Sequence, residues 1–359
     1  MKIRNILMVA STLLLLVSCG SNSSQSGTEQ TPVPKANTLI GAGATFPYPL
    51  YSKMFDEYSK QEGVRVNYQS VGSGAGIKQL QNKIVDFGAS DAPMSDEELK
   101  NSPAPIIHIP TALGAVVITY NLPDNPALKF TPEVLSGVFL GEIKKWNDPK
   151  IAQLNPGVKL PATPISVIHR SDGSGTTFIF SDYLAKVSRG WETAVGRGKS
   201  LNWPTGLGAK GNEGVSGFIK QTPGSIGYVE LAYAFQNKMP MATLQNQSGN
   251  FVAPTLTATS AAANTDDMPA DLRVSITNTP AADGYPLCSF TYVLLYQEQA
   301  YNNRSPEQAK RVVDLIDWML HDGQQFNEAL EYGKLPERVE KKATDILKTV
   351  TYNNELLLK

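Results

Sequence analysis

Three short turns in this chain combine glycines with hydroxyl side chains, and each stands between an apolar run and an apparent helix. A helix N-terminus carries unpaired backbone N–H groups and a partial positive charge, which suit an oxyanion. Glycine lets the backbone approach such a ligand closely. The turns are "GAGATF" (41–46), "GSGAG" (72–76) and "DGSGTTF" (172–178).

Hydroxyl and guanidinium groups in these turns could complete an oxyanion site. Arg170 precedes the third turn by two residues. Any one turn could be a plain helix cap, because Ser and Thr are common N-cap residues. Three such turns and one arginine in a single chain favour a converging site. Its candidate hydroxyl donors are Thr45, Ser73, Ser174 and Thr176.

Other chemistries fit the sequence less well. No turn carries the Lys-Ser or Lys-Thr pair of a P-loop. The stretch "GLGAKG" (206–211) matches the dinucleotide fingerprint, but it follows "SLNWPT", so we expect a loop there. A serine hydrolase stays open as an alternative, although neither Ser73 nor Ser174 lies in a G-x-S-x-G elbow and only His169 is near one of them. With three histidines and two cysteines, the chain offers weak support for a metal site, and we expect neither metal nor cofactor.

Short apolar runs alternate with helical patterns along the chain, which favours α/β architecture. Residues 114–122 and 288–296 are the strongest candidates for buried strands. The stretch after Ser305 predicts a helix that starts with Pro306 and stops at Gly323. Between 241 and 285 the periodicity is poor, so we expect a long surface excursion with little chemistry.

The first 18 residues have the pattern of a lipoprotein signal peptide: basic residues, then an apolar run that ends just before Cys19. Cys19 would carry a diacylglyceryl anchor, and 19–38 would be a flexible tether. Removing 18 of the 359 residues, including Lys2 and Arg4, leaves 341 residues and changes the formal net charge from −1 to −3. Nucleic acid is therefore not an expected partner. Cys288 lies in an apolar run and is expected to be a buried thiol.

Six stretches give the chain a family resemblance. It resembles the periplasmic phosphate-binding proteins of phosphate-specific ABC importers, the PstS type. The stretches are spread over most of the sequence after the tether, and the first, third and fifth together are highly specific. They read "GAGATFPYPLY", "NYQSVGSGAGIKQL", "VDFGASDAPMSDEEL", "GEIKKWNDP", "HRSDGSGTTFIFSDYLAKV" and "GSIGYVELAYA".

The resemblance implies an α/β clamshell of the type II-like periplasmic-binding-protein class. Each lobe would be a mixed, mostly parallel sheet flanked by helices, and two hinge strands would join the lobes. The hinge crossings would fall near Leu113 and Pro286. Lobe I would then comprise 39–112 and 287–359, and lobe II would comprise 113–286.

The resemblance also implies which residues hold phosphate. Asp172 would orient Arg170 through a salt bridge. The family often has a second serine where this chain has Gly74, so no hydroxyl contact is assigned there. The implied contacts are Thr45, the backbone N–H of Phe46, Ser73, Asp91, Arg170, Ser174, Gly175 and Thr176.

Asp91 is the unexpected member of this set, because a carboxylate should repel a phosphate. A ligand that keeps a proton could donate it to the carboxylate, whereas sulfate has no proton to donate at neutral pH. Asp91 would then discriminate against sulfate. An ordinary capping or turn aspartate before "APMSDEE" is the alternative.

We therefore expect a lipid-anchored, extracytoplasmic phosphate receptor that is monomeric and not an enzyme. It would close around inorganic phosphate and deliver it to the permease subunits of an ABC importer. Three alternatives stay open: a receptor for sulfate, molybdate or a phosphonate; an extracellular phosphatase or serine hydrolase; and a purely structural surface lipoprotein.

Overall fold

The computed structural model describes residues 37–264 and 268–358. The predicted signal peptide, Cys19 and the tether up to residue 36 lie outside these residues. Within the described ranges, no helix combines the length and the apolar character needed to cross a membrane.

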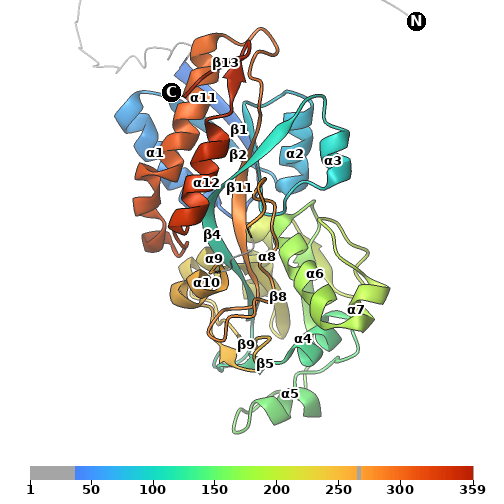
Figure 1. The fold of residues 1–359 in the computed structure, drawn as a ribbon. Helices are drawn as coiled ribbons and strands as arrows, with labels where there is room; N and C mark the ends of the chain where they lie inside the picture. The colour runs from blue at the N-terminus through green and yellow to red at the C-terminus, as the bar shows by residue number, and fades with distance from the viewer. Residues whose placement is uncertain (1–36, 265–267, 359) are drawn as a thin grey trace, which may run out of the picture. The chain divides into compact units, whose positions relative to one another are not determined.

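An eight-stranded mixed sheet forms the centre of the fold, in the order β2-β1-β3-β11-β4-β8-β6-β7 (Figure 1). The strands at both ends pair in parallel, as in β1 with β2 and β3 and in β6 with β7 and β8. The central strands β11 and β4 pair antiparallel with each other and with their outer neighbours, β3 and β8. The mixed, mostly parallel α/β prediction is thus confirmed, with one continuous sheet.

The long strand β4 (Ile106–Tyr120) connects the two halves of this sheet. Its first part pairs with β11 (Cys288–Tyr296) as far as Ala115, and its last five residues pair with β8 (Ser225–Glu230). Both β4 and β11 are buried along nearly their whole length, which explains why their sequences are mostly apolar rather than alternating. The sequence predicted β11 correctly but placed the start of β4 eight residues too late, because Pro110 and Thr111 interrupt the apolar pattern.

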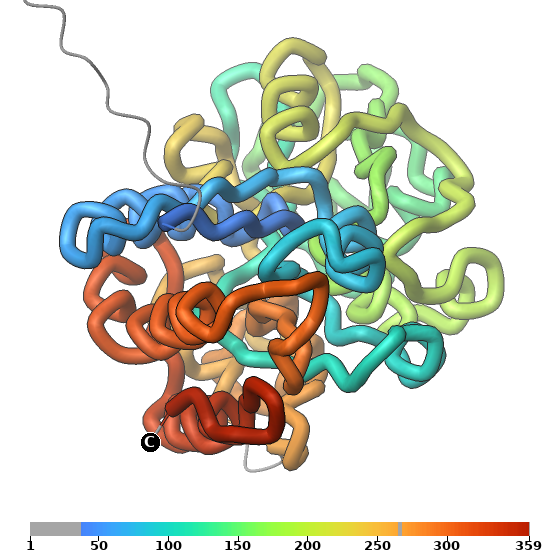
Figure 2. Tube along the Cα trace, turned by 90° about the horizontal axis from the view of Figure 1, so that it is seen from above, coloured from blue at the N-terminus to red at the C-terminus, as the bar shows by residue number. Residues whose placement is uncertain are grey.

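Helices pack in two groups around the two ends of the sheet. In Figures 1 and 2 the blue N-terminal helix α1 lies beside the orange helix α11, near strands β1 and β2. The green and yellow helices α6 and α8 lie around β6 and β8. Segments from both ends of the described part of the chain therefore build one half of the sheet and its helices, and the middle of the chain builds the other.

The other helices and strands lie along the chain in three groups. The first part of the chain contains β1 (Thr38–Gly43), α1 (Tyr48–Glu62), β2 (Arg65–Ser70), α2 (Ser73–Gln81), β3 (Phe87–Ser90) and α3 (Asp96–Lys100). The middle contains β5 (Lys129–Phe130), α4 (Pro132–Phe139), α5 (Pro149–Leu154), β6 (Ser166–Arg170), α6 (Gly175–Val187), α7 (Arg189–Ala194), β7 (Leu207–Ala209), α8 (Gly211–Gln221), α9 (Leu231–Gln236), β9 (Thr243–Gln245), β10 (Phe251–Val252) and α10 (Leu256–Ala262). The last part contains α11 (Pro306–Leu320), two 3-10 turns (Asp322–Phe326 and Glu328–Leu330), α12 (Glu337–Leu347), β12 (Thr351–Tyr352) and β13 (Glu355–Leu356).

Local signals in the sequence place several of these ends. Ser305 caps α11, whose first residue is Pro306. That helix ends at Leu320, three residues before the predicted stop at Gly323. Cys288 is fully buried, as predicted.

Two predictions are wrong. Residues 206–211 are not a plain loop: β7 pairs in parallel with β6, and α8 begins at Gly211. The short strand was hidden because its side chains are mostly exposed and carry no apolar alternation. The segment 241–285 is not only a surface excursion either, since it contains two strands and a helix and buries Leu244, Leu272 and Tyr285.

Candidate oxyanion-binding site

The second and third glycine turns touch each other. The N–H of Gly175 donates to Ser73 Oγ at 3.0 Å, and the N–H of Gly74 donates to the carbonyl of Gly173 at 2.9 Å. Gly72 has φ 94°, and a Cβ there would lie 2.4 Å from Asp172 Oδ2. The close approach of the two turns therefore requires glycine at position 72.

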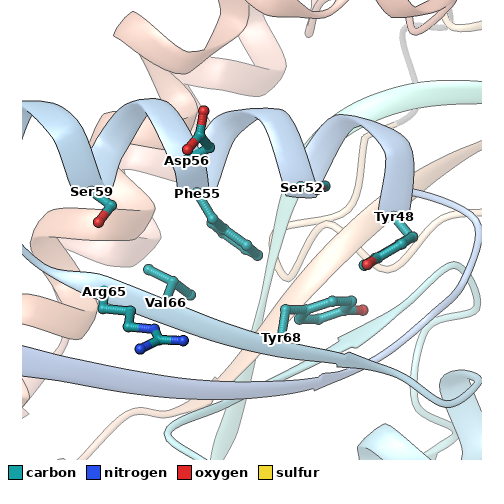
Figure 3. Close-up of a pocket in the computed structure, with 8 residues that line it drawn as sticks. All are labelled: Tyr48, Ser52, Phe55, Asp56, Ser59, Arg65, Val66 and Tyr68. Atoms are coloured by element: carbon teal, nitrogen blue, oxygen red, sulfur yellow. The ribbon is translucent and has the colours of Figure 1, made fainter. Parts of the chain in front are cut away.

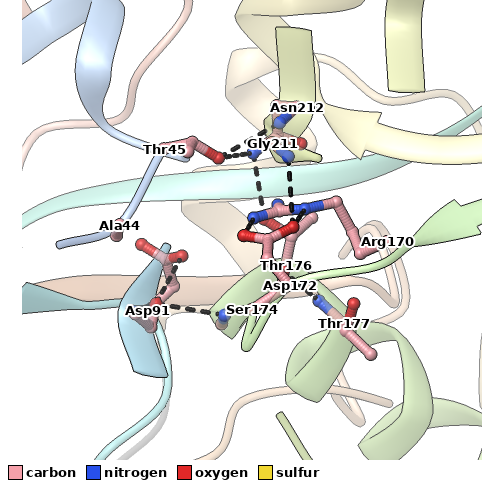
Figure 4. Close-up of polar contacts among 12 residues, drawn as sticks. Ala44, Thr45, Asp91, Arg170, Asp172, Ser174, Thr176, Thr177, Gly211 and Asn212 are labelled. Atoms are coloured by element: carbon pink, nitrogen blue, oxygen red, sulfur yellow. Dashed lines mark hydrogen bonds and ion pairs between the residues drawn. The ribbon is translucent and has the colours of Figure 1, made fainter. Parts of the chain in front are cut away.

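Arg170 ends strand β6 and is held by Asp172 (Figure 4). Its Nε and Nη2 donate to the two carboxylate oxygens at 2.7 and 2.5 Å, and Nη1 donates to Thr176 Oγ1 at 3.3 Å. Burial acts to raise the pKa of Asp172, but the hydrogen bonds and charge of Arg170 hold it below its usual value. The pair stays ionised, and the guanidinium is fixed in the buried site.

Asp91 lies on the other side of the site and is 1% exposed. Its Oδ1 accepts a hydrogen bond from Thr291 Oγ1 at 2.8 Å, and its Oδ2 is 3.4 Å from Ser73 Oγ. Burial raises the pKa of Asp91 to about 7, against the lowering effects of the Thr291 hydrogen bond and the Arg170 charge. Near neutral pH this carboxyl can therefore both accept and donate a hydrogen bond.

The structure brings all the predicted contact residues into the buried interior. Ser174 is the N-cap of α6, and its Oγ accepts from the N–H of Thr177 at 3.0 Å. The first turn is fixed through its carbonyls, since Tyr233 donates to Thr45 O and Tyr332 donates to Phe46 O, both at 2.7 Å. The three turns thus present hydroxyls and helix N-termini to one region.

Asn212 is a site residue that the sequence reasoning missed. It follows the first residue of α8, and its Nδ2 lies 2.8 Å from Thr45 Oγ1 and 3.1 Å from Thr176 Oγ1. The N–H of Gly211 also donates to Asp172 Oδ1 at 3.1 Å. The signal was a fourth glycine turn before a helix, in the stretch "GLGAKG" that we assigned to a loop.

Histidine chemistry has no support at this site. His169 Nδ1 lies 3.0 Å from the carbonyl of Arg170, and its ring stacks on Trp203 with centroids 4.5 Å apart. The His169 side chain therefore packs against Trp203 beside β6. In the described ranges, no cluster of three or more His, Cys, Asp or Glu side chains could hold a metal ion.

A separate pocket of about 340 Å³ lies between α1 and β2 (Figure 3). None of its lining residues belongs to the three turns. This pocket is thus not part of the oxyanion site. Its lining is Tyr48, Ser52, Phe55, Asp56, Ser59, Arg65, Val66 and Tyr68.

Known proteins resemble the chain in sequence and in fold. The family described as "PBP superfamily domain" matches residues 23–322. A phosphate-binding protein PstS of Pasteurella multocida is 46% identical over 309 residues, which cover 85% of this chain and 88% of the relative.

Solved structures give the same fold. One is a high-affinity periplasmic phosphate-binding protein bound with phosphate, with a TM-score of 0.70 and 23% identity over 89% of this chain and 95% of that one. Another is a putative phosphate ABC transporter substrate-binding protein with bound phosphate from Clostridium perfringens, with a TM-score of 0.61 and 16% identity over 84% of this chain and 100% of that one. These similarities confirm the two-lobed fold.

Proposed function

The chain belongs to the PBP superfamily and, within it, to the PstS-type phosphate-binding proteins, which serve ABC importers, and on that premise we propose that it holds inorganic phosphate between Asp91 and Arg170. The first turn contributes Thr45 and the N–H of Phe46. The second and third turns contribute their hydroxyls and the N-termini of α2 and α6. The protein binds phosphate and passes it to the importer.

The contact between Ser73 and Gly175 carries this proposal. This hydrogen bond joins the first residues of α2 and α6, which are 102 residues apart in the chain. The buried Arg170 lies on one side of it, and the buried carboxyl of Asp91 lies on the other. Such a site offers many donors and little excess charge, which suits a small dianion that must lose its hydration shell.

Asp91 supports phosphate over other oxyanions. A carboxyl with a pKa of about 7 and a phosphate that titrates in the same range share one proton, whichever of the two carries it. Sulfate brings no proton, so its binding requires Asp91 to be protonated first. The site therefore favours phosphate, and also arsenate, which resembles phosphate in shape and protonation.

The two sides of the site belong to different proposed lobes. Thr45, Ser73 and Asp91 lie in lobe I, which comprises 39–112 and 287–359. Arg170 and its neighbours lie in lobe II, which comprises 113–286. The change of partner along β4, from β11 to β8 just after Ala115, supports hinge crossings near Leu113 and Pro286. Phosphate then favours the closed form, in which both lobes contact it.

The position of the receptor outside the cytoplasm follows from its family. A lipid anchor on Cys19, the flexible tether, a monomeric state and the absence of catalysis belong to the proposal. The basic and apolar pattern before Cys19 supports the anchor, and the packing of His169 on Trp203 supports a receptor rather than a hydrolase.

The test is calorimetric titration of the protein with phosphate, arsenate and sulfate at pH 8.5, where Asp91 is ionised in the free protein, and at fixed ionic strength. We expect tight binding of the first two and weak or no binding of sulfate. Equal affinity for sulfate would contradict the phosphate assignment. Steady hydrolysis of p-nitrophenyl phosphate by the same preparation would point to the phosphatase alternative.

A further inference from the structure

Each of two threonine hydroxyls at the site accepts two hydrogen bonds from N–H groups. Thr45 Oγ1 accepts from the backbone N and the Nδ2 of Asn212, at 3.2 and 2.8 Å. Thr176 Oγ1 accepts from Asn212 Nδ2 at 3.1 Å and from Arg170 Nη1 at 3.3 Å. Among the described residues, neither hydroxyl donates a hydrogen bond to a protein acceptor.

This arrangement decides which way the hydroxyl protons point. A hydroxyl has two acceptor lone pairs and one O–H donor, and it normally rotates to suit its surroundings. Here N–H groups occupy both acceptor directions of Thr45 and of Thr176. The remaining direction belongs to the O–H bond, so both hydroxyls must act as donors toward the site.

The orientation of the Asn212 amide follows from its third partner. Its Oδ1 accepts from the backbone N–H of Glu230 at 3.0 Å, so the amino group faces the two threonines. The residue is fully buried, and its two amino protons are used by Thr45 and Thr176. Asn212 therefore has no amino proton left for a ligand of its own.

We propose that Asn212 is a positioning residue that locks the Thr45 and Thr176 hydroxyls as donors toward bound phosphate. This inference rests on the proposed function. It also gives Asn212 a role in closure, since one amide joins a hydroxyl of the first turn to a hydroxyl of the third. The four oxygens of phosphate act as hydrogen-bond acceptors, apart from one that can carry a proton. Hydroxyls that are already fixed as donors therefore avoid the free-energy cost of reorienting during binding.

The experiment is a double-mutant cycle on phosphate affinity. Asn212→Ala in the wild-type background should raise the Kd for phosphate about tenfold or more, since two donors lose their fixed direction. In a Thr45→Val, Thr176→Val background the same change should raise the Kd by less than about twofold, because no hydroxyl remains to be oriented. An equal increase in both backgrounds, or no increase in either, would overturn the proposal.

A matched control separates positioning from general stability. Asn155 is also buried and donates through Nδ2 to Lys129 O and Ile151 O, away from the site. Asn155→Ala should lower the melting temperature without changing the Kd. If Asn212→Ala does not fold without phosphate, Asn212→Ser replaces it in the same cycle. Failure of the wild type to bind phosphate would instead reject the proposed function itself.

Discussion

Gly175 lies so close to Asp91 that a Cβ on the glycine would be 2.5 Å from the carboxylate Oδ2. The same Cβ would be 2.6 Å from Ser73 Oγ. Both distances are far inside van der Waals contact. Position 175 therefore tolerates only glycine while the turns around Ser73 and Gly175 remain in contact.

Gly175→Ala should weaken phosphate binding by on the order of 3 kcal/mol, about 100-fold in Kd, because the methyl group holds the two turns apart. The ligand-free melting temperature should change little, since the proposed lobes can remain open. Calorimetry and small-angle scattering with phosphate would check both points. Gly217→Ala in α8 is the control, because its Cβ would meet nothing within 4 Å. Unchanged affinity in Gly175→Ala would show that the observed contact is not needed for binding.

Arg170→Ala should weaken phosphate binding by on the order of 2 kcal/mol or more, since it removes a charged donor from a buried site. Asp172→Asn should cost less, because the guanidinium remains but loses one charged partner. The measurement is phosphate Kd together with the free energy of unfolding. Equal loss of affinity in both variants, accompanied by unfolding, would make the pair structural.

The control for this pair is a second buried arginine and aspartate. Arg304 Nη2 lies 2.5 Å from Asp86 Oδ1, and both side chains are less than 10% exposed. Arg304→Ala should therefore lower the free energy of unfolding and leave phosphate affinity unchanged.

The raised pKa of Asp91 predicts how stability depends on pH. Because the folded protein holds this proton up to about pH 7 and the unfolded chain releases it near its ordinary pKa, the contribution to stability is complete only at low pH. It declines by about 1.4 kcal/mol per pH unit between pH 5 and 7 and is lost above that range.

The check is chemical denaturation of ligand-free wild type and Asp91→Asn at several pH values. The difference in unfolding free energy between them should fall from pH 5 to pH 7 and be flat near pH 8. Glu230 is another buried carboxyl whose pKa is raised by burial and also by the charge of Asp91, so the same comparison is repeated in a Glu230→Gln background. A difference that does not vary with pH would show that Asp91 is already ionised in the folded protein.

The sequence was most informative where the role of a residue depends only on its near neighbours in the chain. Ser305 and Cys288 were predicted correctly, because a helix cap and a buried thiol are set by near neighbours in the chain. Asn212 was missed because its role depends on contact with Thr45, 167 residues away. The strand before it offers no apolar pattern, so the fourth turn appeared to be a loop. The family resemblance supplied Asp91, which no spacing rule would have singled out.

Asp91→Asn should change anion selectivity more than phosphate affinity. In the proposed complex of the wild type a proton lies between the carboxyl and the phosphate, whereas sulfate would meet the ionised carboxylate with a lone pair in a desolvated site. For the ionised form of Asp91 that mismatch should cost sulfate on the order of several kcal/mol, since like charges and unpaired buried polar groups are both expensive. Near pH 7 the carboxyl can take up a proton and donate to sulfate instead, so the discrimination against sulfate should grow above neutral pH. The asparagine amide can donate to sulfate, so sulfate should gain affinity, while phosphate should change only modestly.

The pH dependence of sulfate binding is a second test of the role of Asp91 in anion selectivity. As the pH falls from 8 to 6, Asp91 in the wild type gains its proton around pH 7 and can donate to sulfate, so sulfate affinity should rise. In Asp91→Asn that dependence should vanish, because the amide does not titrate in this range. Competition binding of both anions at fixed ionic strength measures the two effects together. If the ratio of phosphate to sulfate affinity is the same in wild type and Asp91→Asn at every pH, Asp91 does not select the anion, and selectivity must come from the donors on the opposite side of the site.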